Sequence, residues 1–227
     1  MRIYIGEEEL TNRPDEWQVT DVQGLSPQDA AVTTSDRVWL DGATLTGARI
    51  GARTISLKIY PEDGPQEARL ALYDLFPLKE QVSVRFETPL RRAVATGYVR
   101  RVECDIYTAR QSVEVEVLCP DPYLYAPRPV EADSGGVIRN PGLPVGIVAE
   151  SDGGSIGDGT RTFSLITTNV PYVLDSREGS KSVKRQSTGT SLMSTVASGS
   201  KWPVAGRGET TITGATSAYI VPRWLGL

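Results

Sequence analysis

Few side chains in this sequence could carry catalytic chemistry, because its 227 residues include no histidine and only two cysteines. The absence of histidine removes the commonest general base and the commonest metal ligand from the chain. Ser-His-Asp and Cys-His arrangements are therefore impossible within it. Cys104 and Cys119 form neither a Cys-x-x-Cys pair nor a zinc-binding set. We expect no metal-binding and no cofactor-binding residues.

The two cysteines also make a poor candidate for a disulfide. If Ile106 pairs with Gln111 across a turn, Cys104 faces Val113 on the neighbouring strand. Cys119 then faces Tyr98, several residues further along the ladder. Thiols so far apart cannot form a disulfide, so the sequence predicts two reduced thiols in strands.

Carboxylates are numerous, with 28 Asp and Glu, so composition alone leaves a paired-carboxylate hydrolase open. Several of these carboxylates nevertheless lie at expected strand ends or turns, where Asp is favoured for purely local reasons. This group contains Asp21, Asp41, Asp121 and Asp175. No catalytic motif accompanies them, and the sequence therefore predicts no catalytic residues and a protein that is not an enzyme. Two carboxylates in a cleft with raised pKa values would indicate the opposite.

The segment 93–125 dominates the arrangement of the elements. Val113, Val115 and Val117 alternate with polar residues, which is typical of a strand with one buried face. The preceding residues 95–103 are also strand-like, and Tyr107–Arg110 is a plausible connection, so we expect an antiparallel hairpin. The hairpin ends at the Cys-Pro-Asp-Pro-Tyr sequence that follows, because proline cannot donate a backbone hydrogen bond to a neighbouring strand.

A second strand and one helix complete the first half of the chain. Over Arg53–Tyr60, Ile55, Leu57 and Ile59 share one face. Residues from about 64 to 76 predict a helix with an apolar stripe of Ala68, Leu72 and Leu75, which we expect to pack on the sheet. The segment Ala31–Leu40 is polar and is expected to be a loop, with Val38-Trp39-Leu40 as the point where it can return to a sheet. The fold class is therefore mainly β, with one packed α-helix.

Composition divides the chain into two domains. Residues 1–126 are expected to form the β domain with the helix, and residues 127–144 a Pro/Gly-rich linker. Residues 145–227 contain short expected strands between glycine turns, which favours a small β-sandwich. These strands are Val145–Glu150, Arg161–Thr168, Tyr172–Asp175, Ser182–Gln186, Leu192–Val196, Thr210–Gly214 and Ala218–Leu225.

Charge and hydropathy exclude some partners. Residues 1–126 carry 14 Lys and Arg against 20 Asp and Glu, a net charge of −6, and residues 127–227 carry 10 against 8, a net charge of +2. An acidic domain holds DNA poorly but suits a surface that DNA slides past. No apolar run approaches the roughly 20 residues of a membrane helix, and the first residues do not resemble a secretory signal. We expect that the chain does not insert into a membrane and that it stays in the cytoplasm where it is made.

Several motifs, taken in order, resemble the siphophage distal tail protein family, and the Cys-Pro-Asp-Pro-Tyr sequence is the most specific of them. In the second domain, Gly206–Ile212 and Arg223–Gly226 resemble the family more loosely. The motifs of the first domain are Gly24-Leu25-Ser26-Pro27, Asp41-Gly42, Arg53-Thr54-Ile55-Ser56-Leu57, Leu72-Tyr73, Gly97-Tyr98-Val99 and Cys119-Pro120-Asp121-Pro122-Tyr123.

The resemblance implies a structural subunit of a long non-contractile phage tail. Family members form a hexameric ring at the tail tip, in which an N-terminal split β-barrel or sandwich resembles tail-tube subunits. A galectin-like β-sandwich follows it. The implied partners are sister copies, the tail tube protein, the tail hub or fibre protein, the tape-measure protein, and DNA that passes through the lumen without specific binding. The implied location is the virion tail tip.

Two features refine this expectation. A ring needs strand edges that pair between subunits, and the hairpin Ala93–Leu118 is long enough to offer one. The alternative function is a module that binds a host receptor or glycan, because Trp202, Tyr219 and Trp224 could stack on sugars. We expect these three side chains to lie in a core or an interface instead.

Overall fold

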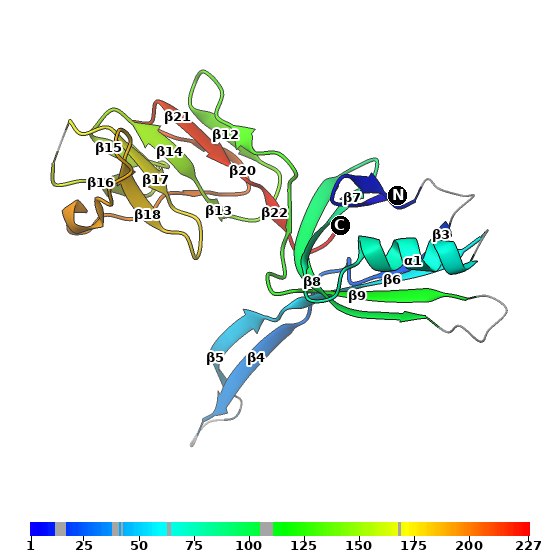
Figure 1. Cartoon of the computed structure of the whole chain (residues 1–227). Coiled ribbons are helices and arrows are strands. Elements are labelled where there is room, and N and C mark those ends of the chain that lie inside the picture. The colour runs from blue at the N-terminus through cyan, green and yellow to red at the C-terminus, as the bar shows by residue number, and fades with distance from the viewer. Residues whose placement is uncertain (12–16, 38–40, 42, 63–64, 105–110, 168) are drawn as a thin grey trace. The chain divides into compact units, whose positions relative to one another are not determined.

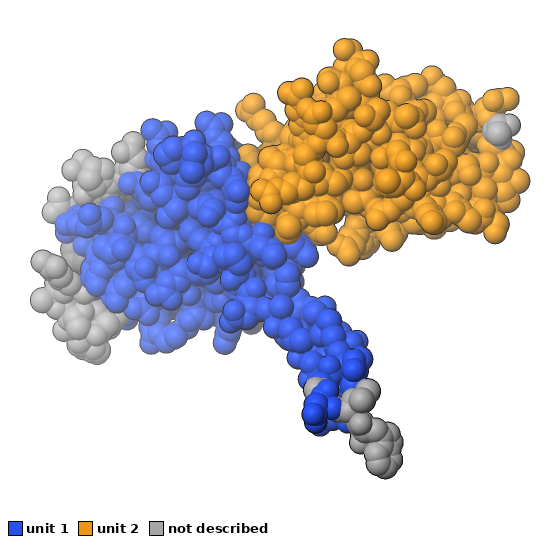
Figure 2. All heavy atoms as spheres, turned by 180° about the vertical axis from the view of Figure 1, so that it is seen from behind, with its two compact units in different colours: residues 1–124, 225–227 blue, residues 125–224 orange. Residues whose placement is uncertain are grey.

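The computed structural model describes residues 1–11, 17–37, 41, 43–62, 65–104, 111–167 and 169–227. The chain is mainly β and divides into two compact units (Figures 1 and 2). Unit 1 comprises Met1–Leu124 and Leu225–Leu227, and unit 2 comprises Tyr125–Trp224. In sequence, unit 2 is thus inserted into unit 1. Among the described residues, no helix has the length and hydropathy needed to cross a membrane.

Unit 1 is a curled half-barrel sheet with one helix and a separate two-stranded sheet. The large sheet has the order β2-β1-β7-β8-β9-β6-β3, and β4 pairs only with β5 among the described strands. The elements are β1 (Arg2–Ile5), β2 (Glu8–Glu9), β3 (Trp17–Gln23), β4 (Ala30–Asp36), β5 (Ala43–Ile50), β6 (Arg53–Pro61), α1 (Pro65–Leu75), β7 (Gln81–Glu87), β8 (Arg92–Cys104) and β9 (Val113–Cys119); β10 (Leu124–Tyr125) spans the boundary between the units.

The β6–β9 ladder forms the centre of the core, as the alternation predicts. Ile55 pairs with Val117, Leu57 with Val115 and Ile59 with Val113, and all six side chains are buried. The helix α1 contacts β6 and buries Ala68 and Leu72. Leu75 is only half-buried, and the neighbouring Phe76 takes the buried position instead. The helix stripe is therefore confirmed, with its last member shifted by one residue.

The predicted register of the hairpin is wrong beyond a β-bulge in β8. Cys104 pairs with Val113 as expected, but Tyr98 pairs with Leu118 rather than with Cys119. The register shifts between Val99 and Arg101, because an extra residue in β8 opposes one residue of β9. The expected connection Tyr107–Arg110 and the pairing of Ile106 with Gln111 lie outside the described residues.

The segment expected to be a polar loop, Ala31–Leu40, provides most of β4. It forms an antiparallel pair with β5, from Ala30 opposite Ile50 to Asp36 opposite Ala43. The prediction was wrong because every residue of β4 is exposed. A strand that buries neither face shows no apolar alternation, so periodicity could not reveal it.

Unit 2 is built from one larger sheet and several strand pairs, consistent with a β-sandwich. The larger sheet has the order β11-β21-β14-β17-β18, and the pairs are β12-β20, β13-β19 and β15-β16. The elements are β11 (Val130–Glu131), β12 (Val137–Asn140), β13 (Val145–Gly146), β14 (Val148–Ser151), β15 (Ser155–Gly157), β16 (Thr162–Ser164), β17 (Tyr172–Asp175), β18 (Ser182–Arg185), the 3₁₀ helix η1 (Met193–Thr195), β19 (Val204–Ala205), β20 (Gly208–Thr211), β21 (Ser217–Ile220) and β22 (Arg223–Trp224).

Two expectations for this region differ from the structure. The range 127–144, expected to be a linker, contains β11 and β12, which pair with β21 and β20. Buried Ile138 and Asn140 in β12 explain why this Pro/Gly-rich segment is ordered. The expected strand Leu192–Val196 is largely the 3₁₀ helix η1, in which no residue is buried.

Candidate assembly site

The groups considered first for chemistry do not converge on a reaction centre. The described residues contain no cluster of three or more metal-ligating side chains. Cys104 and Cys119 are free thiols, and burial raises the pKa of Cys119 to about 11. That thiol is therefore protonated at neutral pH and is a poor nucleophile.

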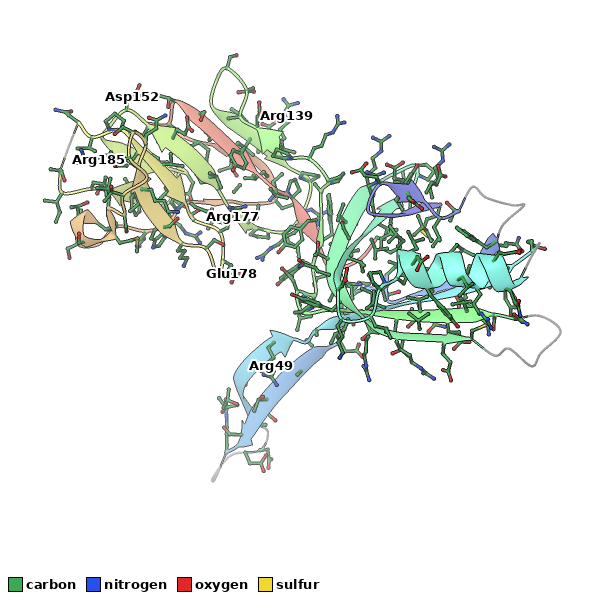
Figure 3. The ribbon with its side chains drawn as sticks, viewed as in Figure 1. Arg49, Arg139, Asp152, Arg177, Glu178 and Arg185 are labelled. Carbon is green, nitrogen blue, oxygen red and sulfur yellow. The ribbon has the colours of Figure 1, made fainter. Side chains whose placement is uncertain are left out.

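The predicted aspartates lie at separate places in the fold. Asp21 is in β3, Asp175 ends β17, and Asp121 accepts the backbone N–H of Tyr123 in a turn, 3.0 Å away. Asp41 lies at an exposed bend. Asp175 is paired with the Arg177 guanidinium at 2.6 Å, and Figure 3 shows Arg177 in unit 2. Asp41, Asp121 and Asp175 lie at a bend, a turn and a strand end as expected, whereas Asp21 lies within β3 and pairs with Lys58.

The β4–β5 hairpin, called the arm below, is the most exposed element of unit 1. It protrudes from the rest of that unit (Figure 2), and Figure 3 labels Arg49 on it. Val32 and Leu45 are 59% and 62% exposed. Local bonds hold the two strands together: Thr46 Oγ1 donates to the Thr33 carbonyl at 2.9 Å, and Arg37 Nε donates to Thr44 Oγ1 at 3.0 Å. Because an isolated two-stranded hairpin is marginally stable in water, the arm is an element that a further surface would stabilise.

The large sheet ends at β2 and at β3, and two of its exposed strand edges lie on opposite sides of β9 and β6. β7 pairs with β8 only as far as Tyr98. In the part of the chain that the structure describes, Arg101–Cys104 pairs with β9, and β8 also pairs with the short strand β10. At the other side the sheet ends with β3, which pairs with β6. Beyond Tyr98, this distal part of β8 has no β7 residue beside it, whereas β9 lies between β8 and β6.

The solvent-facing side of the large sheet between these two edges, called the wet face below, carries charges of both signs. Lys58 Nζ lies 3.1 Å from Glu114, and Arg101 Nη1 lies 3.6 Å from Glu116. A depression of about 330 Å³ runs across this face, lined by Asp21, Gln23, Ser56, Lys58, Arg101 and Glu114 among others. The acids and bases are paired across strands, so the face presents alternating charge rather than a continuous basic track.

A buried arginine, Arg53, joins three segments of unit 1. Its side chain is 0% exposed, and its Nε donates to the Pro122 carbonyl at 2.8 Å. Its Nη1 donates to the carbonyls of Gly24 and of Ser26, the latter at 3.1 Å, and its Nη2 donates to the carbonyl of Leu225. We call this arrangement the Arg53 junction. Burial lowers the pKa of the guanidinium from its ordinary value.

Glycine is required where the chain passes the junction. Gly24 has φ of +85°, and a Cβ there would lie 2.0 Å from the Thr54 carbonyl oxygen. The Arg53 side chain thus binds carbonyls from two of the sequence motifs, Gly24-Leu25-Ser26-Pro27 and Cys119-Pro120-Asp121-Pro122-Tyr123. The motifs alone do not identify Arg53 as the residue that connects them.

The aromatic residues considered for sugar stacking are at least half-buried. Trp202 packs on the core residue Phe163, with ring centroids 4.8 Å apart. Tyr219 lies in β21 and lines a depression of about 370 Å³ together with Glu131 and Asp133. Trp224 lies in β22 and is half-buried. Trp202 therefore packs against the core, as expected.

Comparison with known proteins identifies the fold. The sequence matches no protein-family model and no curated protein. The structure is similar to the Dit protein (gp 19.1) of phage SPP1, with a TM-score of 0.69 and 13% identity over 98% of each chain. That protein is described as a paradigm of the hub adsorption apparatus in phages that infect Gram-positive bacteria.

A second similar structure is a chain of the phage P2 baseplate in its activated conformation with Ca. Its TM-score is 0.51 and its identity 8%, over 100% of this chain and 99% of that chain. At these identities the likeness shows the fold. The fold expected from the motif resemblance is thus confirmed across both units.

Proposed function

We propose that this chain is a structural subunit of a siphophage tail tip, located in the virion, that forms a hexameric ring. The observation that carries the proposal is the fold likeness to the SPP1 Dit protein over 98% of both chains. The motifs of unit 1, which occur in the family's order along the chain, support the proposal independently of the fold. The ring joins the tail tube protein to the hub or fibre protein, and the tape-measure protein and DNA pass through it.

The two open edges of the large sheet supply a means of closing a ring. A ring requires a heterologous contact, in which two different surfaces of one subunit meet their complements on the two neighbouring subunits. The outer edge of β3 and the distal edge of β8 are two such surfaces, because β9 and β6 lie between them. Pairing β3 of one copy with β8 of the next would continue the sheet around the ring and remove both exposed edges.

The arm supplies a second contact between copies. Its exposed Val32 and Leu45 are apolar positions that a sister copy would cover. The paired charges of the wet face fit a lumen that DNA passes without binding, since each base is already engaged by an acid.

The direct test is negative-stain electron microscopy of the full chain, which should show a ring with six-fold symmetry. The double variant Val32→Asp, Leu45→Asp should lose the ring and remain folded. A matched control places two charges at exposed apolar positions of unit 2, Ile166→Asp and Met193→Asp, and should keep the ring. Isolated single particles for the unmodified chain in all conditions would overturn the proposal.

The depression beside Tyr219 favours one second candidate, glycan binding by unit 2. An aromatic side chain beside the carboxylates Glu131 and Asp133 is a combination that suits a sugar. A glycan array with the full chain tests it, with Tyr219→Ala as the variant that should lose any signal. This role would add to the ring function rather than replace it.

A further inference from the structure

The Arg53 junction holds a buried charge without an acidic partner among the residues that the structure describes. Arginine stays protonated under all ordinary conditions, so its guanidinium must be compensated inside the protein. The compensation here comes from four backbone carbonyls, of Gly24, Ser26, Pro122 and Leu225. Each carbonyl accepts a charge-assisted hydrogen bond, and losing one leaves part of a buried charge unsatisfied.

One of these carbonyls belongs to a segment that follows unit 2 in sequence. Residues 225–227, called the clasp below, make two more bonds within unit 1. Arg91 Nη1 donates to the Gly226 carbonyl at 2.6 Å, and the Leu227 N–H donates to the Leu25 carbonyl at 3.0 Å. The clasp therefore contacts the same turn, 24–27, whose carbonyls Arg53 also holds.

The fit of the clasp is close. A Cβ at Gly226 would lie 2.9 Å from Pro27 Cδ and 3.2 Å from the Pro27 nitrogen. Larger residues at position 226 would push the clasp away from the turn. The Gly24-Leu25-Ser26-Pro27 turn is thus shaped on one side by Thr54 and on the other by Gly226.

We propose that the clasp completes the Arg53 junction, so that unit 1 reaches its stable, assembly-competent form only after the chain has been made through Leu227. Unit 2 lies between the two parts of unit 1 in sequence, so it must be synthesised before the clasp can bind. Chains that end within unit 2 lack the clasp and are thereby kept out of the ring. The effect on assembly rests on the proposed ring function, whereas the effect on unit 1 stability does not.

The test compares four forms of the protein, three full-length and one shortened, by hydrogen–deuterium exchange. They are the unmodified chain, a chain ending at Trp224, Gly226→Val, and Leu225→Ala as the matched control. Leu225→Ala keeps the backbone carbonyl that Arg53 uses, so its exchange in unit 1 should stay within about 3-fold of the unmodified chain. The chain ending at Trp224 and the Gly226→Val variant should both exchange roughly 10- to 100-fold faster than the unmodified chain at residues 22–27, 53–61 and 117–123. Peptides of β14 and β17 in unit 2 should not change.

A second variant keeps the proposal testable where the shortened chain fails to fold. Arg53→Lys keeps the charge but cannot reach three segments at once, so it should reproduce the accelerated exchange of the shortened chain. Combining Arg53→Lys with Gly226→Val should add little, because both disrupt one junction. Unchanged protection of unit 1 in the chain ending at Trp224 would overturn the proposal, as would additive effects in the double variant.

The two proposals fail in distinguishable ways. If the unmodified chain forms no ring but shows the expected exchange pattern, the clasp proposal is supported and the ring function is contradicted. If the chain ending at Trp224 forms rings equally well and its unit 1 stays protected, the ring function is supported and the clasp proposal is contradicted.

Discussion

The β6–β9 ladder and the arm are both antiparallel strand pairs of unit 1, yet they differ in what holds them. In the ladder, Ile55, Leu57 and Ile59 meet three valines on a face with no exposure to water. In the arm, seven consecutive residues of β4 are exposed. The ladder is stabilised by its own core, whereas the arm has no core of its own among the described residues. The sequence thus encodes one strand pair that is buried within its own unit and one whose faces stay exposed, and the proposed ring would cover the second with a sister copy.

The largest expected effect comes from placing a charge in the ladder. Val115 is fully buried, so Val115→Asp must bury a carboxylate without a partner or unfold the sheet. We expect loss of folded unit 1 and, with it, loss of the ring. Circular dichroism and size-exclusion chromatography measure both. The control is Glu116→Gln on the wet face of the same strand, which should leave folding intact.

A smaller effect is expected where the helix packs on the ladder. Leu72→Ala removes a fully buried side chain of α1 and should lower the free energy of unfolding by about 2–5 kcal/mol. Leu70→Ala is the matched control, because Leu70 is exposed on the same helix. Urea denaturation distinguishes the two, and equal losses for both variants would contradict the packing described for α1.

The stability of unit 2 should depend on pH in the acidic range. Burial of Asp158 alone would raise its pKa, but N–H donation from Val204, Thr160 and Arg161 outweighs burial and holds the pKa below its ordinary value. The folded form therefore binds this proton less readily than the unfolded form. The resulting stability is present above the unfolded pKa of about 3.9 and is lost as pH falls through the folded pKa.

The measurement is acid unfolding followed by hydrogen exchange in unit 2. Asp158→Asn removes the titrating group, so the variant should lose stability less steeply than the unmodified chain below about pH 4. Asp152→Asn, an exposed position of the same unit (Figure 3), serves as the control. Parallel curves for Asp158→Asn and the unmodified chain would contradict the role assigned to these bonds.

The smallest expected effect on stability belongs to the arm. Val32→Asp with Leu45→Asp should change the free energy of unfolding of the single subunit by less than about 0.5 kcal/mol, because both side chains are already exposed. The same substitutions should prevent assembly. A loss of several kcal/mol in the isolated subunit would show that the arm is part of the folding core, and would remove the contrast with the ladder.

The sequence predicted the ladder well but not the strands of the arm, and the reason is burial. Alternation at Val113, Val115 and Val117 marks a half-buried strand, whereas the Thr- and Ala-rich arm has no buried face to produce a pattern. The register beyond Val99 was missed because a β-bulge depends on tertiary contacts rather than on local composition.

Arg53 illustrates a signal that was present in the sequence but not used. It lies two, four and six residues before Ile55, Leu57 and Ile59, so the alternation of the strand itself places Arg53 on the same buried face. A charged residue at a core position predicts a buried partner set. Its partners are carbonyls from segments up to 172 residues away in sequence, so no local pattern could have named them.

The native mass of the full chain tests the central claim, that the open edges and the arm of unit 1 are completed by sister copies. Native mass spectrometry should give a hexamer of six 24.6-kDa subunits, about 148 kDa, and the arm double variant should give the subunit mass. A chain that remains at 24.6 kDa at every concentration and ionic strength would contradict the account.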